Sequence, residues 1–227
     1  MNDLNNKIVQ SSFTGIVEVF VSHPIEYMKT HIQCGKSMKT LKIYPKLYFN
    51  SMYPRFVTII PMRTIFWTSY YYHKDINSHL LWSSFSTSLL QTVFDYPSEQ
   101  IKTKQMMNTN NKNLSYIECL KGKYPFIGFS SHFIRNYIFL YSYFGFKNNK
   151  DSFTNNLIGS LTGVFISHPF DTMKTLYQNE TPEILYNYSK KDYTKQINFL
   201  MRGVLLRALN TTNAMIIGWF MFNYVYN

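Results

Sequence analysis

Cysteine, charged residues and long apolar runs are all scarce in this sequence of 227 residues. The only two cysteines, Cys34 and Cys119, cannot form a disulfide framework, and neither lies in a Cys/His cluster, so we expect no metal site. Charged residues make up 15% of the chain, against about 25% in an average soluble domain, which argues against a disordered chain or a coiled coil. With 9 Gly and 8 Pro, the chain is also neither collagen-like nor linker-like.

Acidic residues are fewer than basic ones, 12 against 23, which gives a formal net charge of +11. Such a charge raises the possibility of nucleic-acid binding. No short stretch interleaves basic and aromatic residues, so we expect no nucleic-acid partner. The sequence contains no nucleophile–base pair and no glycine-rich phosphate loop, so we predict neither an enzyme nor a bound cofactor. The opening residues resemble neither a secretory signal nor a transit peptide, and we expect no cleavable presequence.

No stretch of 18 residues is wholly apolar, but six segments come close to membrane-spanning length, each with at most one Asp, Glu, Lys or Arg. These segments are 8–21, 56–72, 80–94, 126–146, 157–166 with its flanks, and 204–225. Lysines gather between the segments, whereas a soluble helical bundle, the alternative, would spread charge along one face of every helix. We therefore predict an all-α membrane protein with six transmembrane helices.

One sequence motif occurs three times, with the shared core Pro-x-acid-x-x-Lys-Thr. Its copies are residues 21–30, 94–103 and 166–175. Pro24, Pro97 and Pro169 are separated by 73 and 72 residues, and each follows an apolar segment. This spacing predicts one domain, 1–227, built of three tandem helical hairpins with threefold pseudosymmetry, approximately 1–77, 78–150 and 151–227, with both termini on one side.

Each motif places a proline that should kink its helix before an acid and a base that share one helix face. The simpler possibility is a pair within one helix, such as Glu26 with Lys29. Three copies at one depth favour pairing between neighbouring hairpins, which would close a ring. The expected pairs are Glu26 with Lys102, Glu99 with Lys174, and Asp171 with Lys29.

At these residues the chain resembles the mitochondrial carrier family, whose signature is Pro-x-[Asp/Glu]-x-x-[Lys/Arg] in three tandem repeats. The resemblance implies a monomeric transporter of the mitochondrial inner membrane whose ring is the matrix-side gate. The family often carries a glutamine four residues after the base, as a brace beneath the gate. Gln33 and Gln178 match this position, whereas Met106 does not.

The repeats are shorter than the family's, so its surface helices on the matrix side should be short or vestigial. The short repeats and the Asn/Lys/Ile/Tyr-rich composition resemble the reduced carriers that giant viruses encode, which would place the protein in the host cell's mitochondria. Of the family's glycine elements linked to cardiolipin, only Met201-Arg202-Gly203 and Gly128 remain. A cardiolipin contact and a generic basic surface are both open interpretations.

In the family, three contact points on the even-numbered helices bind the substrate. Aligning the repeats places them at Thr58, at the pair Arg135-Asn136, and at Asn210. An arginine in such a position should face a cavity or a partner. We predict that Arg135 contacts the substrate, the alternative being a structural pairing with a carbonyl or tyrosine.

The family's second gate, on the cytoplasmic side, is nearly absent here. Its remnants are Tyr71, Lys74, Asp151 and Asn223, and no acidic residue occupies the acidic position in any repeat. We therefore expect the cytoplasmic gate to be weak and the empty protein to rest open toward the cytoplasm.

The excess positive charge favours an anionic cargo. We predict an alternating-access exchanger of nucleotides or deoxynucleotides, with keto- or dicarboxylates as the alternative cargo. A carrier fold that no longer transports and serves as a membrane receptor or scaffold is the alternative from another class.

Overall fold

The computed structural model describes residues 2–35, 45–76, 78–107, 115–120, 126, 128–149, 152–179 and 193–225. Every regular element within these residues is helical, which confirms the all-α prediction. In chain order the elements are α1 (Asn2–Gln33), α2 (Pro45–Asp75), α3 (Leu80–Met107), α4 (Tyr116–Leu120), α5 (Phe129–Asn149), α6 (Phe153–Gln178), α8 (Tyr193–Leu200), α9 (Val204–Phe220) and the π-helix η2 (Met221–Val225).

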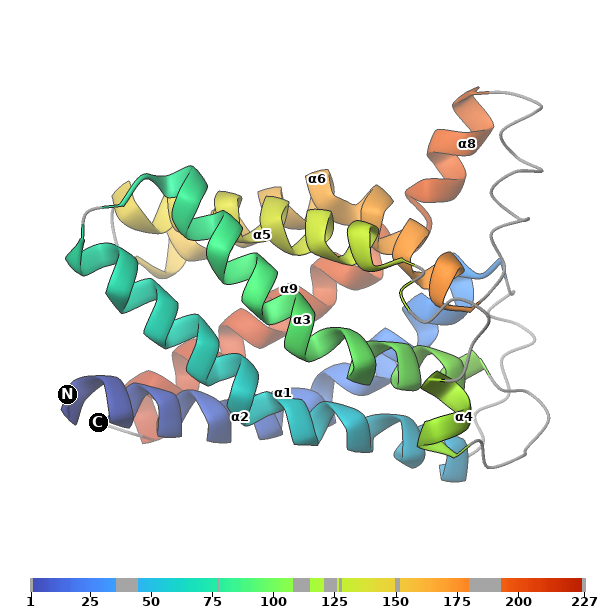
Figure 1. Ribbon diagram of the computed structural model, residues 1–227, viewed down its shortest axis with the longest axis horizontal. Helices are drawn as coiled ribbons and strands as arrows, with labels where there is room; N and C mark the ends of the chain where they lie inside the picture. Colours follow the sequence, from blue (N-terminus) through green and yellow to red (C-terminus); the bar gives the residue numbers. More distant parts are fainter. Residues whose placement is uncertain are drawn as a thin grey trace.

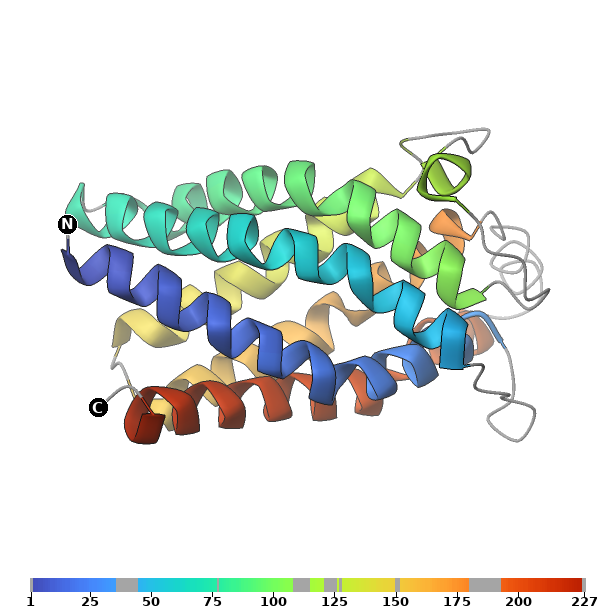
Figure 2. The same ribbon diagram turned by 90° about the horizontal axis from the view of Figure 1, so that it is seen from below.

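The six long helices form a closed ring around a common interior. Helix α1 packs on α2, α2 on α3, α3 on α5, α5 on α6, α6 on α9, and α9 returns to α1. Both termini lie at one end of the bundle, and the short helices α4 and α8 lie at the other (Figures 1 and 2). We call these the terminal end and the loop end. Helices α1, α3 and α6 also contact one another, so the first helices of the three predicted hairpins meet inside the ring.

The prediction of six transmembrane helices is wrong for this structure. Among the described residues, no helix combines the length and the apolar character needed to cross a membrane. The physical reason is the polar content of each helix. In α3, for example, Ser83, Ser84, Thr87, Ser88 and Thr92 are all buried in a stretch that the sequence analysis counted as apolar.

Polar side chains dominate the interior, and bulky apolar side chains lie on the outside. The buried residues include many hydroxyl, amide and charged side chains, whereas an apolar core cluster among the described residues consists of Val19, Met52 and Ile59 with Phe56 against it. Exposed apolar side chains occur on all six long helices, for example Phe13, Val57, Leu90, Tyr141, Phe165 and Leu205. The outer surface is therefore far more apolar than the interior.

Glycines set two features of the packing. A Cβ added at Gly159 of α6 would lie 2.8 Å from the Cβ of Phe146, so this glycine permits the close approach of α6 to α5. Gly128 and Gly203, at equivalent positions before α5 and α9, have φ of 88° and 81°, a left-handed conformation that favours glycine. These glycines allow the chain to turn sharply into each helix.

Pro24, Pro97 and Pro169 lie inside α1, α3 and α6, and each helix continues past its proline to the loop end. A proline removes one main-chain hydrogen bond and favours a bend at this point. The segment that follows each proline carries the acid and the base of the motif. The division into three repeats and the kinking role of the prolines remain predictions.

Candidate functional site: an ion-pair ring inside the bundle

The segments of α1, α3 and α6 that follow the prolines bring the six charged residues of the motifs together. The nitrogen Nζ of Lys29 lies 2.9 Å from Oδ2 of Asp171, and Nζ of Lys102 lies 2.8 Å from Oε1 of Glu26. Lys174 forms an ion pair with Glu99. These are the three pairs expected between hairpins, and all six residues are buried. We call this set the ion-pair ring: Glu26, Lys29, Glu99, Lys102, Asp171 and Lys174.

A pair within one helix is also present. Lys102 contacts Glu99 three residues before it, in addition to Glu26 on the neighbouring hairpin. Glu99 therefore holds two lysines, Lys102 and Lys174, and Lys102 holds two carboxylates. Removing one partner of a buried ion pair leaves an uncompensated charge. Glu99 and Lys102 are consequently the two ring residues that each bind two other members of the ring.

The two predicted brace glutamines contact the ring or lie against it. Nε2 of Gln33 donates to Oδ2 of Asp171 at 2.9 Å and to Oγ1 of Thr172 at 3.3 Å. Its Oε1 accepts a hydrogen bond from Thr175 at 3.0 Å. Oε1 of Gln178 accepts from Thr103 at 3.2 Å. Gln33 thus joins α1 to α6, and Gln178 joins α6 to α3.

Both glutamines bind threonines that the sequence analysis did not assign. Thr103 and Thr175 are the last residues of the motif and follow the lysines directly. The recurrence of threonine at this place in all three copies was the signal that could have revealed them. The third brace position holds Met106, which is buried and apolar.

Arginines from α2 and α5, the second helices of two predicted hairpins, contact the ring, which the sequence analysis did not foresee. Arg55 of α2 forms an ion pair with Glu26. Arg135 of α5 lies 3.1 Å from Oδ1 of Asp171 and also donates to the side chain of its neighbour Asn136. Arg135 is therefore held by a ring carboxylate in this structure. Its predicted role as a substrate contact remains untested.

The other predicted contact residues have different surroundings. Thr58 donates its hydroxyl to carbonyl oxygens of its own helix at 3.2 and 3.3 Å. Asn136 donates to Oγ1 of Thr92 at 3.0 Å. Oδ1 of Asn210 is buried and has no hydrogen-bond partner among the described residues. No direct contact joins these three positions to one another in the described part of the chain.

The predicted gate at the other end is described only in part. Lys74 is exposed, and the amide of Asn223 donates to the carbonyl oxygen of Trp219 in its own helix at 2.8 Å. Asp151 lies outside the described residues. Tyr71 alone belongs to a larger cluster of side chains.

This cluster brings two lysines against aromatic rings. Nζ of Lys147 lies 4.4 Å from the ring centroid of Tyr70, 5.1 Å from that of Trp67 and 5.8 Å from that of Tyr143. Nζ of Lys7 lies 5.5 Å from the centroid of Tyr71 and 5.8 Å from that of Trp67. We call this set the aromatic–lysine cluster: Lys7, Trp67, Tyr70, Tyr71, Tyr143 and Lys147. It joins α1, α2 and α5.

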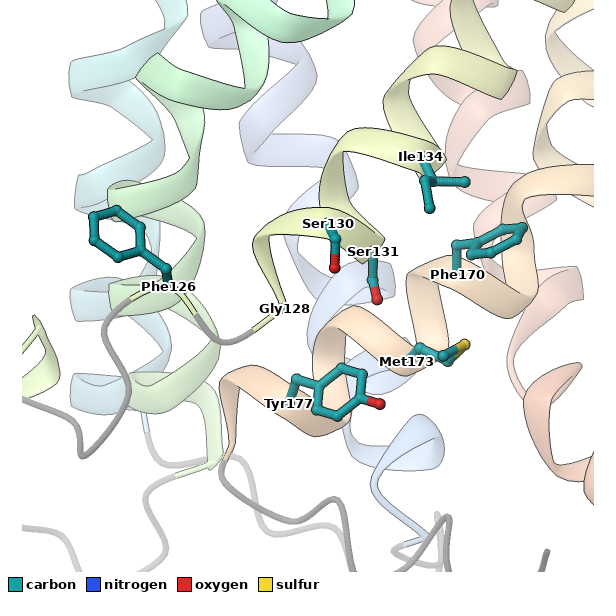
Figure 3. A pocket seen from close by; sticks show the side chains of 8 residues that line it. All are labelled: Phe126, Gly128, Ser130, Ser131, Ile134, Phe170, Met173 and Tyr177. Atoms are coloured by element: carbon teal, nitrogen blue, oxygen red, sulfur yellow. The ribbon is translucent and has the colours of Figure 1, made fainter.

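A separate hollow lies between the start of α5 and the second half of α6, with a volume of about 440 Å³ (Figure 3). The residues that line it are Phe126, Gly128, Ser130, Ser131, Ile134, Phe170, Met173 and Tyr177. The hydroxyls of Ser130 and Ser131 are its polar groups nearest the start of α5 (Figure 3). Gly128 borders it, and a Cβ there would lie 3.1 Å from Cβ of Tyr177. Gly203, the other predicted lipid-contact glycine, lies before α9 and does not line it.

Potential metal ligands do not gather anywhere in the described residues, where no group of three or more His, Cys, Asp or Glu side chains could hold an ion. Cys34 and Cys119 are both buried and form no disulfide. Burial raises the pKa of the Cys119 thiol, which keeps it protonated at neutral pH. No protein-family model matches this chain, and no curated protein matches it.

Proposed function

We propose that this protein is an alternating-access transporter that exchanges an anionic metabolite, most favourably a nucleotide or deoxynucleotide, across the mitochondrial inner membrane. The observation that carries the proposal is the ion-pair ring, in which three lysines and three carboxylates join α1, α3 and α6 in a closed cycle. The proposal rests on this ring and its resemblance to a carrier gate. It does not include the prediction of six transmembrane helices, which the structure contradicts.

The ring suits a gate because it links three separate segments through bonds that can break and re-form. Breaking a buried charge pair by removing one partner costs about 3–5 kcal/mol. A ligand that binds more tightly to the open state than to the closed one can offset this amount and shift the equilibrium. Arg55 and Arg135 connect the ring to α2 and α5. A ligand that binds these arginines would weaken their ion pairs with the ring carboxylates.

An anionic cargo fits the charge of the interior. The ring is electrically balanced, and Arg55, Arg135 and Arg207 add positive charge to it. Focused positive charge attracts anions and raises their local concentration. Nucleotides and keto- or dicarboxylates are both anions, so the interior charge alone does not choose between them.

The outer surface supports a lipid environment for a protein that acts as a monomer. Large contiguous apolar surfaces mark membrane or protein interaction sites. The hollow beside Gly128 is where this proposal places an anionic lipid such as cardiolipin, because main-chain amides at the start of a helix favour phosphate.

The test is uptake by liposomes that contain the full-length purified protein. We expect labelled ATP or dATP to enter vesicles loaded with unlabelled nucleotide faster than labelled malonate or a keto acid does. Uptake of the carboxylates alone would support the alternative cargo. No uptake of any of these, with helical content and vesicle incorporation verified, would overturn transport and favour the receptor or scaffold function.

A charge exchange tests the gate itself. Glu99→Lys and Lys174→Glu should each abolish uptake, and the double variant should restore part of it. Restoration should be incomplete because the new lysine would lie beside Lys102, which also contacts Glu99. Glu18→Gln is the matched control, since Glu18 pairs with Arg63 away from the ring. A double variant as inactive as either single change would show that the pair is not part of a gate.

A further inference from the structure

Two tyrosines from different parts of the chain stack on the outer surface of the bundle. Tyr53 lies in the first third of α2, and Tyr116 is the first residue of α4. Their ring centroids lie 5.8 Å apart, and the two ring planes are inclined by 16°. Stacked aromatic pairs typically have centroids about 4.5–7 Å apart. Neither tyrosine belongs to the repeated motif, the ion-pair ring or the aromatic–lysine cluster.

Solvent reaches both rings of this pair. The exposed fraction is 56% for Tyr53 and 43% for Tyr116. A small oxidant can therefore approach either phenol, and a proton released from either hydroxyl passes directly to water. The pair lies toward the loop end, where α4 is found (Figure 1).

Helix α4 is fixed to the bundle, which defines the position of Tyr116. The main-chain nitrogen of Ser115 donates to Oε2 of Glu118 at 2.8 Å, and that of Glu118 donates to Oγ of Ser115 at 3.2 Å, so the start of α4 is capped reciprocally. Cys119, three residues after Tyr116, is buried. Helix α4 packs on α3, which in turn packs on α2. Packing of the helices therefore presents Tyr116 to Tyr53.

The phenol groups of the two rings lie close enough to interact electrostatically. Partial burial raises the pKa of the Tyr116 phenol, and the neighbouring phenol of Tyr53 raises this pKa further. Tyr116 consequently keeps its proton at neutral pH, so its oxidation must remove a proton together with an electron. In a phenoxyl radical the unpaired electron is shared with the ring carbons next to the oxygen. The carbons that can couple therefore lie beside the interacting hydroxyls.

We propose that Tyr53 and Tyr116 form a site of oxidative cross-linking, where a one-electron oxidant such as a haem peroxidase with hydrogen peroxide joins the two rings as dityrosine. Each phenol loses one electron and one proton and becomes a phenoxyl radical. Hydrogen peroxide takes up both electrons and both protons and becomes two molecules of water. The radicals form one carbon–carbon bond between carbons ortho to the hydroxyls, and the hydrogen atoms of those carbons then move to the oxygens, which restores both phenols.

This bond would connect the first two predicted hairpins. Tyr53 belongs to the first hairpin and Tyr116 to the second, so the cross-link closes a long loop of the chain. Closing a long loop reduces the entropy of the unfolded chain, which raises the melting temperature. An oxidising environment would thus fasten α4 to α2. The inference goes beyond the proposed function and does not depend on transport.

Two other tyrosine pairs provide an internal comparison. Tyr70 and Tyr71 are neighbours in α2 with ring centroids 5.7 Å apart, and Tyr137 and Tyr141 lie one turn apart in α5 with centroids 6.3 Å apart. A bond within either pair would join residues of one helix and close no long loop. A bond between α2 and α4 is therefore recognised by the two distant peptides that it links.

The experiment oxidises the purified full-length protein with a haem peroxidase and hydrogen peroxide, at neutral pH and low protein concentration. Dityrosine fluorescence and the melting temperature are measured on the monomer fraction after gel filtration, and mass spectrometry identifies the linked peptides. We expect a linked pair that contains Tyr53 and Tyr116, together with a higher melting temperature than before oxidation. Absence of this pair, or dityrosine confined to dimers, would overturn the proposal.

Variants that lack one hydroxyl sharpen the test. Tyr53→Phe and Tyr116→Phe keep the stacked rings but remove one of the two phenols. Each should lose at least half of the monomer's dityrosine fluorescence and the rise in melting temperature. Tyr72→Phe is the matched control, because Tyr72 is 60% exposed and its ring contacts His73, and it should cross-link as the original protein does. With folding verified by circular dichroism, unchanged fluorescence in Tyr53→Phe would contradict the site.

Discussion

The two ends of the bundle hold buried lysines in chemically different ways. Beyond the prolines, toward the loop end, Lys29, Lys102 and Lys174 face carboxylates on neighbouring helices. In the other half, Lys147 is buried against the rings of the aromatic–lysine cluster. Breaking a buried ion pair costs about 3–5 kcal/mol, whereas a cation–π contact contributes about 0.5–2 kcal/mol. The comparison indicates stronger contacts at the loop end of the bundle than at the terminal end.

The difference in contact strength between the two ends concerns the expectation that the empty protein rests open toward the cytoplasm. The sequence predicted a strong matrix gate and a weak cytoplasmic gate, and this remains a prediction; the aromatic–lysine cluster includes Tyr71, one of the residues of the predicted weak gate. Accessibility labelling of a cysteine introduced at Asn210, in a protein without Cys34 and Cys119, tests the hypothesis. Labelling mainly from the matrix side would contradict it.

The largest effect should come from Glu99→Gln, which removes the carboxylate shared by Lys102 and Lys174. We expect the free energy of unfolding to fall by about 3–5 kcal/mol, because two buried ammonium groups lose their shared counter-ion. Chemical denaturation followed by circular dichroism measures it. Glu18→Gln, which removes a more exposed pair with Arg63, should cost about 1 kcal/mol or less. Equal losses of unfolding free energy in the two variants would show that the ring stabilises the protein no more than the Glu18–Arg63 pair does.

Next in size is the loss of a brace. Gln33→Leu removes a hydrogen bond to the charged Asp171, and such bonds contribute about 1.5–3 kcal/mol. Gln178→Leu is the matched control, because it removes a neutral hydrogen bond from Thr103 that contributes about 0.5–1.5 kcal/mol. Thermal and denaturant unfolding of both variants would rank them. If Gln178→Leu costs more, the brace does not act through the charge of Asp171.

A smaller effect is expected at the other end. Lys147→Met keeps most of the side-chain volume and removes the charge above Trp67, Tyr70 and Tyr143, so it should cost about 0.5–2 kcal/mol. In the uptake assay we expect faster exchange, since the weaker closure is weakened further. Lys147→Arg should behave as the original protein because it keeps the cation–π contacts. A cost above that of Glu99→Gln would reverse the comparison between the two ends.

Spacing in the sequence predicted the pairs of the ring but not what surrounds it. Equal separation of Pro24, Pro97 and Pro169 placed the acids and bases at one depth, and three-residue offsets placed them on one face. The contacts of Arg55 and Arg135 depend on how α2 and α5 are rotated and shifted against their neighbours, and spacing along the chain does not determine this.

The aromatic–lysine cluster joins residues from three helices that share no motif, so it left no sequence signal beyond a high aromatic content. The error about transmembrane helices has a different origin. Counting charges overlooked the serines and threonines that fill the interior of α3. Each hydroxyl group reduces the hydropathy of a helix by less than a charge does, but several together reduce it enough to matter, while they satisfy their hydrogen bonds with main-chain carbonyls of the preceding turn, as Thr92 does with Ser88.

The smallest expected effect concerns the brace position that the pattern leaves unfilled. Met106 of α3 is equivalent to Gln33 and Gln178, and by the same succession of helices a glutamine there would point to α1, where Thr30 follows Lys29. Met106→Gln should change the free energy of unfolding by about 1 kcal/mol or less, because a new hydrogen bond offsets the burial of an amide. Met106→Asn, whose shorter side chain cannot reach α1, should cost about 1–3 kcal/mol as a buried amide without a partner. Equal losses of unfolding free energy in the two variants would mean that a glutamine at position 106 cannot form a hydrogen bond to α1. Only α1 and α6 could then carry a brace glutamine.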